Sequence, residues 1–362
     1  MKIRAAVTQG QGQEFVIEDI DLAEPKSNEV LVKIIATGVC HTDAVARDAA
    51  IAPLPAVLGH EGAGIVEKIG DNVKNVKPGD HVVLSFAHCG HCQNCLTGHP
   101  SVCETFNELN FGGVNDDYTH RLSKDGTELS TFFGQSSFGT FAVSHERNVV
   151  KVDEDVDLVL LGPLGCGIQT GAGTVLNKLQ PKFGASIAIY GAGAVGLSAI
   201  MAAKIAGCKN IIAVDVYDNR LELAKELGAT HLLNGKKVDI VKEIKEITKG
   251  GTEYAVDTTG VPPVIRQSLK ALRSLGIAAI VGVTPEMNID IHNDLMAEGK
   301  TMIGVIEGDS VPQIFIPQLI EYYKKGLFPF DKLVKFYDFN QINEAFAASK
   351  SGEVLKPILK IQ

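Results

Sequence analysis

The sequence predicts an α/β fold in two parts: a mainly β region and, after it, a doubly wound parallel sheet. Before about residue 150, short apolar runs such as 30–35 and 81–84 are separated by turn signals such as 77–80. This pattern is typical of antiparallel strands joined by long loops. From about residue 164, strand-like and helix-like segments alternate. Such alternation predicts a parallel sheet covered by helices on both faces.

The elements of the alternating region can be named from the sequence. Buried strands are expected at 186–190, 210–214, 254–257 and 277–281. Helices are expected at 196–206 and 220–227, and Gly228 ends the second of them. After about residue 307 the pattern predicts a helix at 314–325 and a final strand at 355–361.

Length and charge exclude several classes of protein. The chain has 362 residues, more than the ~100–200 of one average domain, so two domains are expected. Its net charge is −9 and it has no dense basic stretch, so no nucleic-acid partner is expected. It begins without the apolar core of a signal peptide, and no run approaches the ~20 apolar residues that span a bilayer. We therefore expect a cytoplasmic protein without membrane association.

A glycine-rich turn joins the strand at 186–190 to the next helix. Gly191 allows the tight turn, Gly193 lets the backbone approach a pyrophosphate, and Gly196 permits close helix–strand packing. The helix N-terminus attracts phosphates. Asp215 ends the following strand and would accept hydrogen bonds from the adenosine ribose, which favours NAD over NADP. Arg220 is either a contact to the ribose or a phosphate, or a solvated helix residue.

Four of the seven cysteines lie within fifteen residues: Cys89, Cys92, Cys95 and Cys103. An odd total and this crowding favour metal binding over a disulfide framework. Four thiolates fill the tetrahedral coordination of a structural zinc and leave no open position. An iron–sulfur centre is the alternative, because repeated C-x-x-C spacing also occurs in ferredoxins. His88, His91 and His99 flank this lobe and are interpreted as surface residues.

Three further residues are candidates for a dispersed metal site. Cys40 stands in the segment 38–43, His60 in 59–62, and Cys166 in 162–167, just before the cofactor turn. Singly, a buried cysteine is usually a small core residue, and a lone histidine is more often a core group than a ligand. Cys208 fits no motif and is expected in the core.

In combination, the order and spacing of these motifs resemble the zinc-containing medium-chain alcohol dehydrogenases over essentially the whole chain. The stretches 134–141, 162–173 and 333–339 resemble the bacterial aryl- (benzyl-) alcohol dehydrogenases in particular, with geraniol and other allylic-alcohol dehydrogenases as neighbours. The resemblance implies a GroES-like zinc domain formed by residues 1–168 and 308–362. It implies a Rossmann NAD-binding domain at 169–307.

The resemblance also implies one catalytic and one structural zinc per subunit. The catalytic zinc would be held by Cys40, His60 and Cys166, with water or substrate at the fourth place. Glu61 corresponds to a carboxylate close to the metal. Asp43 corresponds to the acid that orients the ligating histidine, with a solvated loop aspartate as the alternative.

The same resemblance implies which residues transfer the proton. The zinc would lower the pKa of the alcohol, and the alkoxide would pass a hydride to the nicotinamide. Thr42 corresponds to a hydroxyl that relays the proton. Many members of the family have a histidine three residues later as terminal acceptor, but this chain has Val45. His41 would be either that base or, as we favour, a contact to the cofactor pyrophosphate.

Other residues correspond to cofactor contacts. Thr170 matches a position that packs under the nicotinamide, and Val281 and Val283 match residues that line its face. Val195, within the glycine-rich turn, belongs to the same set. Lys356 matches a basic residue that clamps the pyrophosphate, with a surface lysine as the alternative.

The expected activity is the reversible, NAD-dependent oxidation of a primary aromatic or allylic alcohol to its aldehyde. The alternatives are a geraniol-type terpenoid or broad primary alcohol dehydrogenase, and a glutathione-dependent formaldehyde dehydrogenase. A small apolar alcohol or aldehyde is the expected partner. Phe86, Val283 and Ile306 are candidate walls of its pocket, or ordinary core residues. The segment 301–307 resembles the strand that pairs across the family's dimer interface, so a homo-oligomer, dimer or tetramer, is expected.

Overall fold

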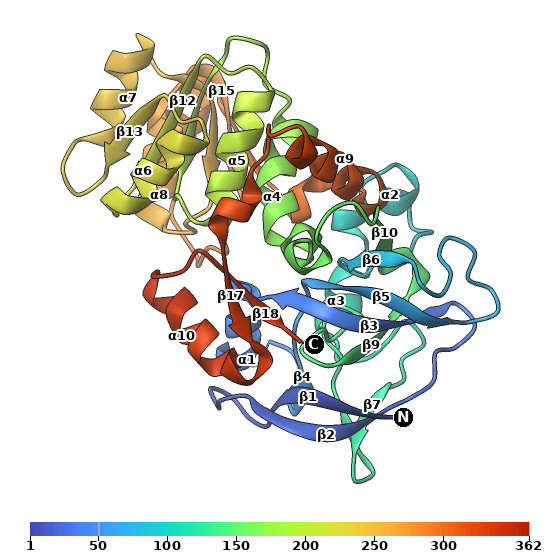
Figure 1. Ribbon diagram of the computed structural model, residues 1–362. Helices are drawn as coiled ribbons and strands as arrows, with labels where there is room; N and C mark the ends of the chain where they lie inside the picture. The colour runs from blue at the N-terminus through green and yellow to red at the C-terminus, as the bar shows by residue number, and fades with distance from the viewer. Residues whose placement is uncertain (50, 362) are drawn as a thin grey trace. The chain divides into compact units, whose positions relative to one another are not determined.

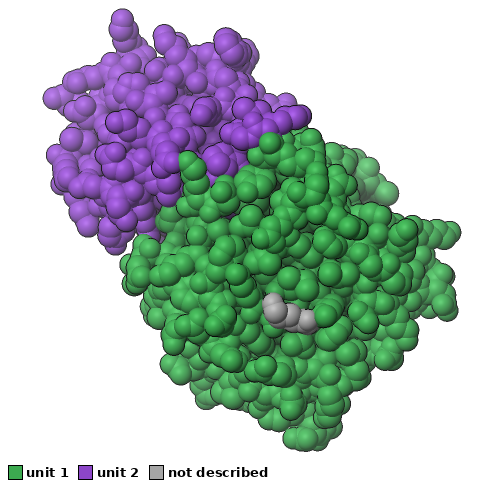
Figure 2. Space-filling view, in the orientation of Figure 1, with its two compact units in different colours: residues 1–167, 311–324, 330–362 green, residues 168–310, 325–329 purple. Residues whose placement is uncertain are grey.

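The computed structural model describes residues 1–49 and 51–361, which form two compact units (Figure 2). The first unit comprises Met1–Gly167, Val311–Lys324 and Phe330–Gln362. The second comprises Ile168–Ser310 and Lys325–Pro329. The chain therefore leaves the first unit twice: once for most of the second unit, and once more for the short segment Lys325–Pro329. The domain boundaries inferred from the sequence stay a prediction.

The first unit is built on two sheets (Figure 1). One has the strand order β4-β1-β2-β7-β8, with β1 (Lys2–Thr8), β2 (Val16–Leu22), β4 (Ala56–Val57), β7 (Leu122–Lys124) and β8 (Thr127–Leu129). The other has the order β10-β6-β5-β3-β18-β17, and β9 also pairs with β3. Its strands are β3 (Glu29–Gly38), β5 (Gly62–Ile69), β6 (His81–Leu84), β9 (Phe141–His145), β10 (Val149–Lys151), β17 (Val334–Asp338) and β18 (Lys356–Lys360).

The end of the chain completes this second sheet. β18 pairs antiparallel with β3, and β17 pairs parallel with β18. The core of the unit therefore joins N-terminal side chains to Phe346 and Leu359 from the C-terminal segment. The helices of the unit are α1 (His41–Ala49), α2 (Gln93–Leu96), α3 (Phe106–Phe111), α9 (Pro312–Lys324) and α10 (Ile342–Ser351).

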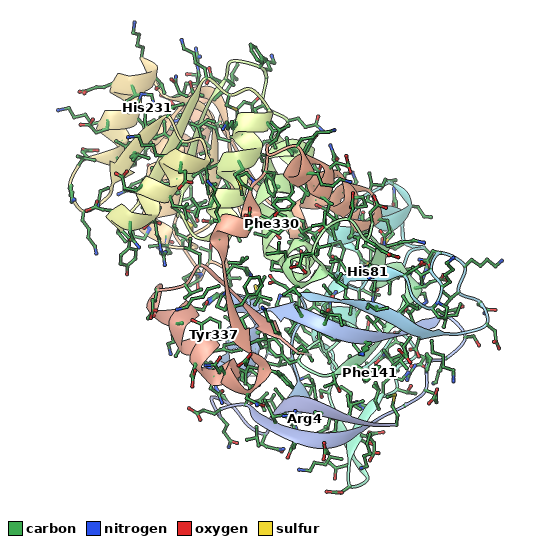
Figure 3. All side chains as sticks on the ribbon, viewed as in Figure 1. Arg4, His81, Phe141, His231, Phe330 and Tyr337 are labelled. Atoms are coloured by element: carbon green, nitrogen blue, oxygen red, sulfur yellow. The ribbon has the colours of Figure 1, made fainter. Side chains whose placement is uncertain are left out.

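The second unit is a six-stranded parallel sheet with the order β13-β12-β11-β14-β15-β16. Its strands are β11 (Ser186–Tyr190), β12 (Asn210–Asp215), β13 (His231–Asn234), β14 (Thr252–Asp257), β15 (Leu272–Ile280) and β16 (Thr301–Gly304). Its helices are α4 (Gly167–Gly173), α5 (Ala194–Ile205), α6 (Asp218–Leu227), α7 (Ile240–Thr248) and α8 (Pro262–Ala271). Figure 3 labels His231, which begins the edge strand β13. This order is that of two mononucleotide-binding halves that meet between β11 and β14.

Burial explains why these segments form a parallel sheet. All five residues of β11 are buried, as expected for a strand covered on both faces. The Ala-rich α5 is buried over most of its length, so it packs closely against the sheet. The predicted fold class, a doubly wound parallel sheet with a mainly β unit, is confirmed. Among the described residues, no helix has both the length and the apolar character needed to cross a bilayer.

Several element ends differ from those expected. The helix predicted at 314–325 is Pro312–Lys324, because proline is well tolerated in a first helical turn. The strand predicted at 277–281 begins earlier, at Leu272, directly after α8. The helix predicted at 196–206 is Ala194–Ile205, so it begins inside the glycine-rich turn.

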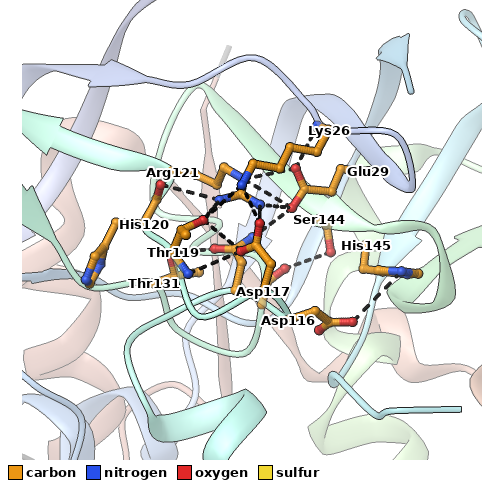
Figure 4. Close-up of polar contacts among 12 residues, drawn as sticks. Lys26, Glu29, Asp116, Asp117, Thr119, His120, Arg121, Thr131, Ser144 and His145 are labelled. Carbon is orange, nitrogen blue, oxygen red and sulfur yellow. Dashed lines mark hydrogen bonds and ion pairs between the residues drawn. The ribbon is translucent and has the colours of Figure 1, made fainter. Parts of the chain in front are cut away.

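A partly buried ion-pair network fixes the loop before β7 to the start of β3 (Figure 4). The guanidinium of Arg121 donates to the Glu29 carboxylate at 2.7 to 3.1 Å, and both side chains are buried. Arg121 also donates to Asp117 at 2.9 Å, and Lys26 pairs with the same carboxylate. Burial alone would raise the pKa of Asp117, but the bond from Lys26 and the nearby Arg121 hold it well below its ordinary value. The network is structural, because its positive and negative groups satisfy one another.

Candidate functional site

The three dispersed candidates meet in the first unit. Cys40 follows β3, His60 precedes β5, and Cys166 lies between a short 3₁₀ turn (Gly162–Gly165) and α4. One ligand atom from each of these residues, and one from Glu61, lie within 4.8 Å of one another. Four potential metal ligands from distant parts of the chain thus converge on one point.

His60 is oriented for metal binding. Its Nδ1 lies 2.8 Å from Oδ1 of Asp43, and both side chains are fully buried. The ring also stacks on Phe133, with centroids 4.5 Å apart. Its Nε2 is buried and has no hydrogen-bond partner among the described residues. A buried nitrogen of this kind is costly unless a ligand satisfies it, so Nε2 is the atom aimed at a metal.

Asp43 forms hydrogen bonds to other groups of the site besides His60. Its carboxylate also accepts hydrogen bonds from the backbone N–H groups of Cys40 and Gly59, each at 3.1 Å. One side chain therefore fixes two of the candidate ligands. Asp43 is 0% exposed, so it is not a solvated loop aspartate.

The ionisation of the donors suits a divalent metal. The bond with Cys166, supported by Lys356 and His60, holds the pKa of Cys40 well below its ordinary value. Burial opposes charge on His60, but the carboxylate of Asp43 and the sulfur of Cys40 raise its pKa well above normal. Metal binding requires the unprotonated Nε2, so it would displace a proton there. Two sulfurs and one imidazole nitrogen form a donor set that zinc prefers, with one coordination place left over.

Behind this site lies a buried ion pair that the sequence did not reveal. Nζ of Lys356 lies 2.8 and 2.9 Å from the carboxylate oxygens of Glu61 and 3.3 Å from the carbonyl oxygen of Val39. Burial raises the pKa of Glu61 to about 7, although Lys356 opposes the shift. Lys356 is 3% exposed, which excludes the surface lysine considered above. A contact with pyrophosphate would require this pair to separate.

The cysteine lobe has the geometry of a closed zinc site. The sulfurs of Cys89 and Cys95 are 3.9 Å apart, and those of Cys92 and Cys103 are 4.0 Å apart. Four sulfurs placed tetrahedrally at ~2.3 Å from zinc are about 3.8 Å apart. All four sulfurs lie within 4.8 Å of one another, which suits one ion better than a cluster whose cysteines bind different irons. The two groups thus have the donor sets of two zinc sites, one open and one closed.

Backbone amides support the lobe. The backbone N–H of Cys92 donates to the sulfur of Cys89, and that of Cys89 donates to the sulfur of Cys103, both at 3.3 Å. The backbone N–H groups of Glu104 and Cys95 donate to the Cys92 sulfur and lower its pKa to about 6. His91 and His99 are exposed, as expected, whereas His88 is half-buried. Its Nδ1 is buried, and burial together with Arg147 lowers its pKa to about 4.

In the second unit, the glycine-rich turn has the expected shape. Gly191 adopts a φ of +91°, and a Cβ at Gly196 would lie 1.8 Å from the carbonyl oxygen of Gly191, so no other residue fits there. Nothing lies within 4 Å of a Cβ built at Gly193. The carboxylate of Asp215 accepts the backbone N–H of Ala192 at 2.6 Å. The end of β12 is thereby tied to the turn before α5.

The other residues predicted to bind the cofactor or to transfer the proton lie in different parts of the fold. Arg220 lies over the ring of Tyr217, 4.9 Å from its centroid. Thr42 Oγ1 is 3.7 Å from the Cys40 sulfur, whereas His41 is exposed. Thr170 is buried and touches Glu307, a residue that the motifs did not assign.

The candidate pocket walls differ in their exposure. Val281 follows β15 directly, and Val283 is 83% exposed. Ile306 is 47% exposed, whereas Phe86 is buried in the core of the first unit.

Comparison with known proteins agrees with this arrangement. Residues 26–154 match the alcohol dehydrogenase GroES-like domain, and residues 194–324 match the zinc-binding dehydrogenase domain. A geraniol dehydrogenase from Castellaniella defragrans is 46% identical over 361 residues, which cover 98% of this chain and 97% of that protein. The chain belongs to the zinc-dependent medium-chain alcohol dehydrogenase family.

Solved structures of this alcohol dehydrogenase family are equally similar. The benzyl alcohol dehydrogenase of Acinetobacter calcoaceticus is 50% identical, with a TM-score of 0.96 and full coverage of both chains. An alcohol dehydrogenase zinc-binding domain protein from Burkholderia ambifaria is 51% identical, with a TM-score of 0.98, and the match covers 100% of this chain and 99% of that one. The zinc alcohol dehydrogenase resemblance seen in the motifs is therefore confirmed.

Proposed function

We propose that this zinc alcohol dehydrogenase oxidises primary aromatic or allylic alcohols to aldehydes, with NAD as hydride acceptor. The observation that carries the proposal is the convergence of Cys40, His60 and Cys166 with the buried, unpartnered Nε2 of His60. The substrate class is supported by the benzyl alcohol and geraniol dehydrogenases that resemble the chain along its whole length. Both substrates carry the reacting hydroxyl on a carbon next to an unsaturated group.

Each residue of the site has a separate role in the proposed reaction. Zinc in such a site supplies Lewis acidity, which lowers the pKa of an alcohol hydroxyl. Asp43 holds the ring of His60 and the backbone of Cys40 in place. Thr42, 3.7 Å from the Cys40 sulfur, accepts the hydroxyl proton and passes it on, since threonine has too high a pKa to keep it.

The terminal proton acceptor is a separate question because Val45 cannot hold a proton. His41 is exposed, and we assign it to the cofactor pyrophosphate rather than to proton transfer. The pH–rate profile of His41→Gln tests this assignment. We expect an unshifted profile and a raised Michaelis constant for NAD. Loss of the acidic limb of the profile would make His41 the base.

The preference for NAD rests on Asp215 at the end of β12. A carboxylate there accepts the ribose hydroxyls of NAD and repels the 2′-phosphate of NADP. Gly191, Gly193, Val195 and Gly196 would bind the pyrophosphate at the start of α5. Thr170, Val281 and Val283 would line the nicotinamide, and Arg220 would reach the adenosine ribose.

One panel of assays tests the proposal. The zinc-loaded enzyme is incubated with benzyl alcohol, cinnamyl alcohol, geraniol and ethanol, with NAD or NADP, and the absorbance of the reduced cofactor is followed. We expect kcat/KM with NAD to be highest for the aromatic and allylic alcohols. Higher activity with formaldehyde and glutathione than with any of these alcohols would contradict the proposal and favour a glutathione-dependent formaldehyde dehydrogenase.

A further inference from the structure

The pairing of β5 with β6 ends just before the open zinc site. The last pair of residues in this antiparallel ladder is Ala63 and Val83. Beyond it, the chain of β5 leads back to His60, and the chain of β6 leads on to Ser85, and both residues are fully buried. Buried backbone N–H and C=O groups are costly without a partner, so another group must bind them where the ladder stops.

The side chain of Gln135 binds the backbone at this point. Its Nε2 donates to the carbonyl oxygens of His60 at 3.1 Å and Ser85 at 3.2 Å, and its Oε1 accepts the backbone N–H of Gly62 at 3.3 Å. Gln135 is 1% exposed. The amide thus uses both of its donor hydrogens and its acceptor oxygen, which no aliphatic side chain could replace. One side chain therefore joins the backbone of a candidate zinc ligand to the segment after β6.

Ser85 extends this connection to a second candidate ligand. Its hydroxyl donates to the carbonyl oxygen of Gly165 at 2.7 Å, and Gly165 directly precedes Cys166. A Cβ at Gly165 would lie 2.1 Å from the carbonyl oxygen of the last residue of β6, so the two segments are in backbone contact. Gln135 and Ser85 therefore connect the backbone of His60 with that of Cys166, although these ligands come from distant parts of the chain.

The turn that carries Gln135 is held in an uncommon conformation. Phe133, Gly134 and Ser136 have positive φ values, of 52°, 57° and 51°. Such a backbone persists outside glycine only where the surroundings enforce it, and it concentrates at functional sites. The hydroxyl of Ser136 accepts the backbone N–H of Phe132 at 2.9 Å and donates to the carbonyl oxygen of the last residue of β4 at 2.7 Å. These bonds fix the turn, so the amide of Gln135 lies at a defined point.

This connection is separate from the one made by Asp43. Asp43 joins the ring of His60 to the backbone of Cys40. Gln135 and Ser85 join the backbone of His60 to the residue before Cys166. Two buried connections therefore link the three candidate ligands, and His60 belongs to both of them.

We propose that Gln135 is a positioning residue of the open zinc site, where it sets the separation of His60 from Cys166. Its bonds reach the backbone of the ligand segments, so it determines where the ligands stand. Contacts that support metal ligands in this way contribute to affinity, and their loss weakens binding by ~10- to 100-fold. The inference rests on the proposed assignment of His60 and Cys166 as zinc ligands.

The test replaces Gln135 with leucine, which has a similar size and no hydrogen-bonding group. Zinc affinity at the open site is measured by competition with a chelator. The arrangement of the ligands is followed by the visible absorption bands of cobalt(II) exchanged into that site. We expect Gln135→Leu to weaken zinc binding there by about tenfold or more and to shift the cobalt bands, while the closed site keeps its zinc. An affinity within about twofold of the wild type, or unshifted cobalt bands, would overturn the inference.

Asn343→Leu is the matched control in the same unit. The amide of Asn343 donates to the carbonyl oxygen of Phe15 at 2.9 Å and accepts its backbone N–H at 3.0 Å. Its loss also removes a bridge between a side-chain amide and the backbone, but the bridge does not involve a ligand segment. We expect Asn343→Leu to lower the Tm and to keep the wild-type zinc affinity and cobalt bands. Shifts equal to those of Gln135→Leu would overturn the inference, because they would show a general loosening of the unit.

A second variant keeps the proposal testable if Gln135→Leu does not fold. Ser85→Ala removes the hydroxyl that binds Gly165 and so cuts the same connection at its other end. We expect it to shift the cobalt bands in the direction expected of Gln135→Leu, by a smaller amount, and unshifted bands would overturn the inference. A wild-type enzyme that holds zinc in the closed site alone would instead overturn the ligand assignment itself, so the two failures are distinguishable.

Discussion

Oδ1 of Asp43 lies 2.8 Å from Nδ1 of His60, and neither side chain is exposed to solvent. The same carboxylate holds the backbone N–H of Cys40. Asp43 thus sets the direction of one zinc ligand and the position of another. A carboxylate behind a ligating histidine also makes the imidazole a stronger donor.

Replacing Asp43 should weaken the catalytic zinc site without affecting the closed one. In Asp43→Asn, the amide N–H₂ cannot accept the bonds that the carboxylate accepts, so we expect zinc affinity at this site to fall by ~10- to 100-fold. Competition with a chelator of known affinity measures the change. Asp48→Asn, on the exposed side of α1, is the matched control and should retain both zincs. An unchanged affinity in Asp43→Asn would show that the pair does not support the metal.

Replacing only one member of the buried ion pair between Lys356 and Glu61 should lower the free energy of unfolding. Lys356→Met leaves a buried carboxylate without its cation, and we expect the free energy of unfolding to fall by about 3–5 kcal/mol. Adding Glu61→Gln should restore most of that stability, because no buried charge then lacks a partner. Urea denaturation followed by circular dichroism measures both. Additive losses in the double variant would contradict the coupling.

The closed cysteine site should govern zinc content independently of the catalytic site. Cys103→Ala removes one of four sulfurs, so we expect the metal content to fall from about two zincs per chain to about one, with a lower Tm. Elemental analysis and thermal melting check these outcomes. Cys208→Ser is the control, since Cys208 belongs to neither group of ligands. Two retained zincs in Cys103→Ala would exclude the four-sulfur site.

Acid should destabilise the protein partly through the network in Figure 4. The folded-state pKa of Asp117 is depressed, so its contribution to stability is present above its unfolded-state pKa of ~3.9 and is lost as the pH falls below that value. We expect the drop in Tm between pH 5 and pH 3 to be smaller in Asp117→Asn than in the wild type. Asp71→Asn, in an exposed turn, should follow the wild type. Parallel curves for all three proteins would refute a role for Asp117.

The proposed homo-oligomer should depend on the free edge of β16. The strand ends the parallel sheet, and its outer side is not paired with another strand among the described residues. If segment 301–307 pairs with a second copy, Ile303→Lys should shift the protein toward the monomer in sedimentation experiments, because edge charges oppose strand pairing. Val238→Lys, near the opposite edge strand β13, should leave the assembly unchanged. A monomeric wild type would exclude the interface.

Local spacing determined much of this protein in advance. Four cysteines within fifteen residues need only local turns to meet, so their pattern alone predicts the closed zinc site. The glycine-rich turn likewise joins a strand to the helix that follows directly, and its shape depends on neighbours in sequence. Periodicity and alternation predicted the parallel sheet for the same reason, although helix and strand ends shifted by a few residues where proline and packing decided them.

Tertiary structure alone decided the relations between distant residues. Lys356 and Glu61 are 295 positions apart, and only the pairing of β18 with β3 brings the lysine into the core. Glu307 and Thr170 are 137 positions apart, and backbone contact between a left-handed turn and α4 joins them. The burial of Nδ1 of His88 also had no signal in its neighbours. Sequence patterns report chemistry that is contiguous along the chain, whereas burial and the pairing of charges depend on which segments the fold packs together.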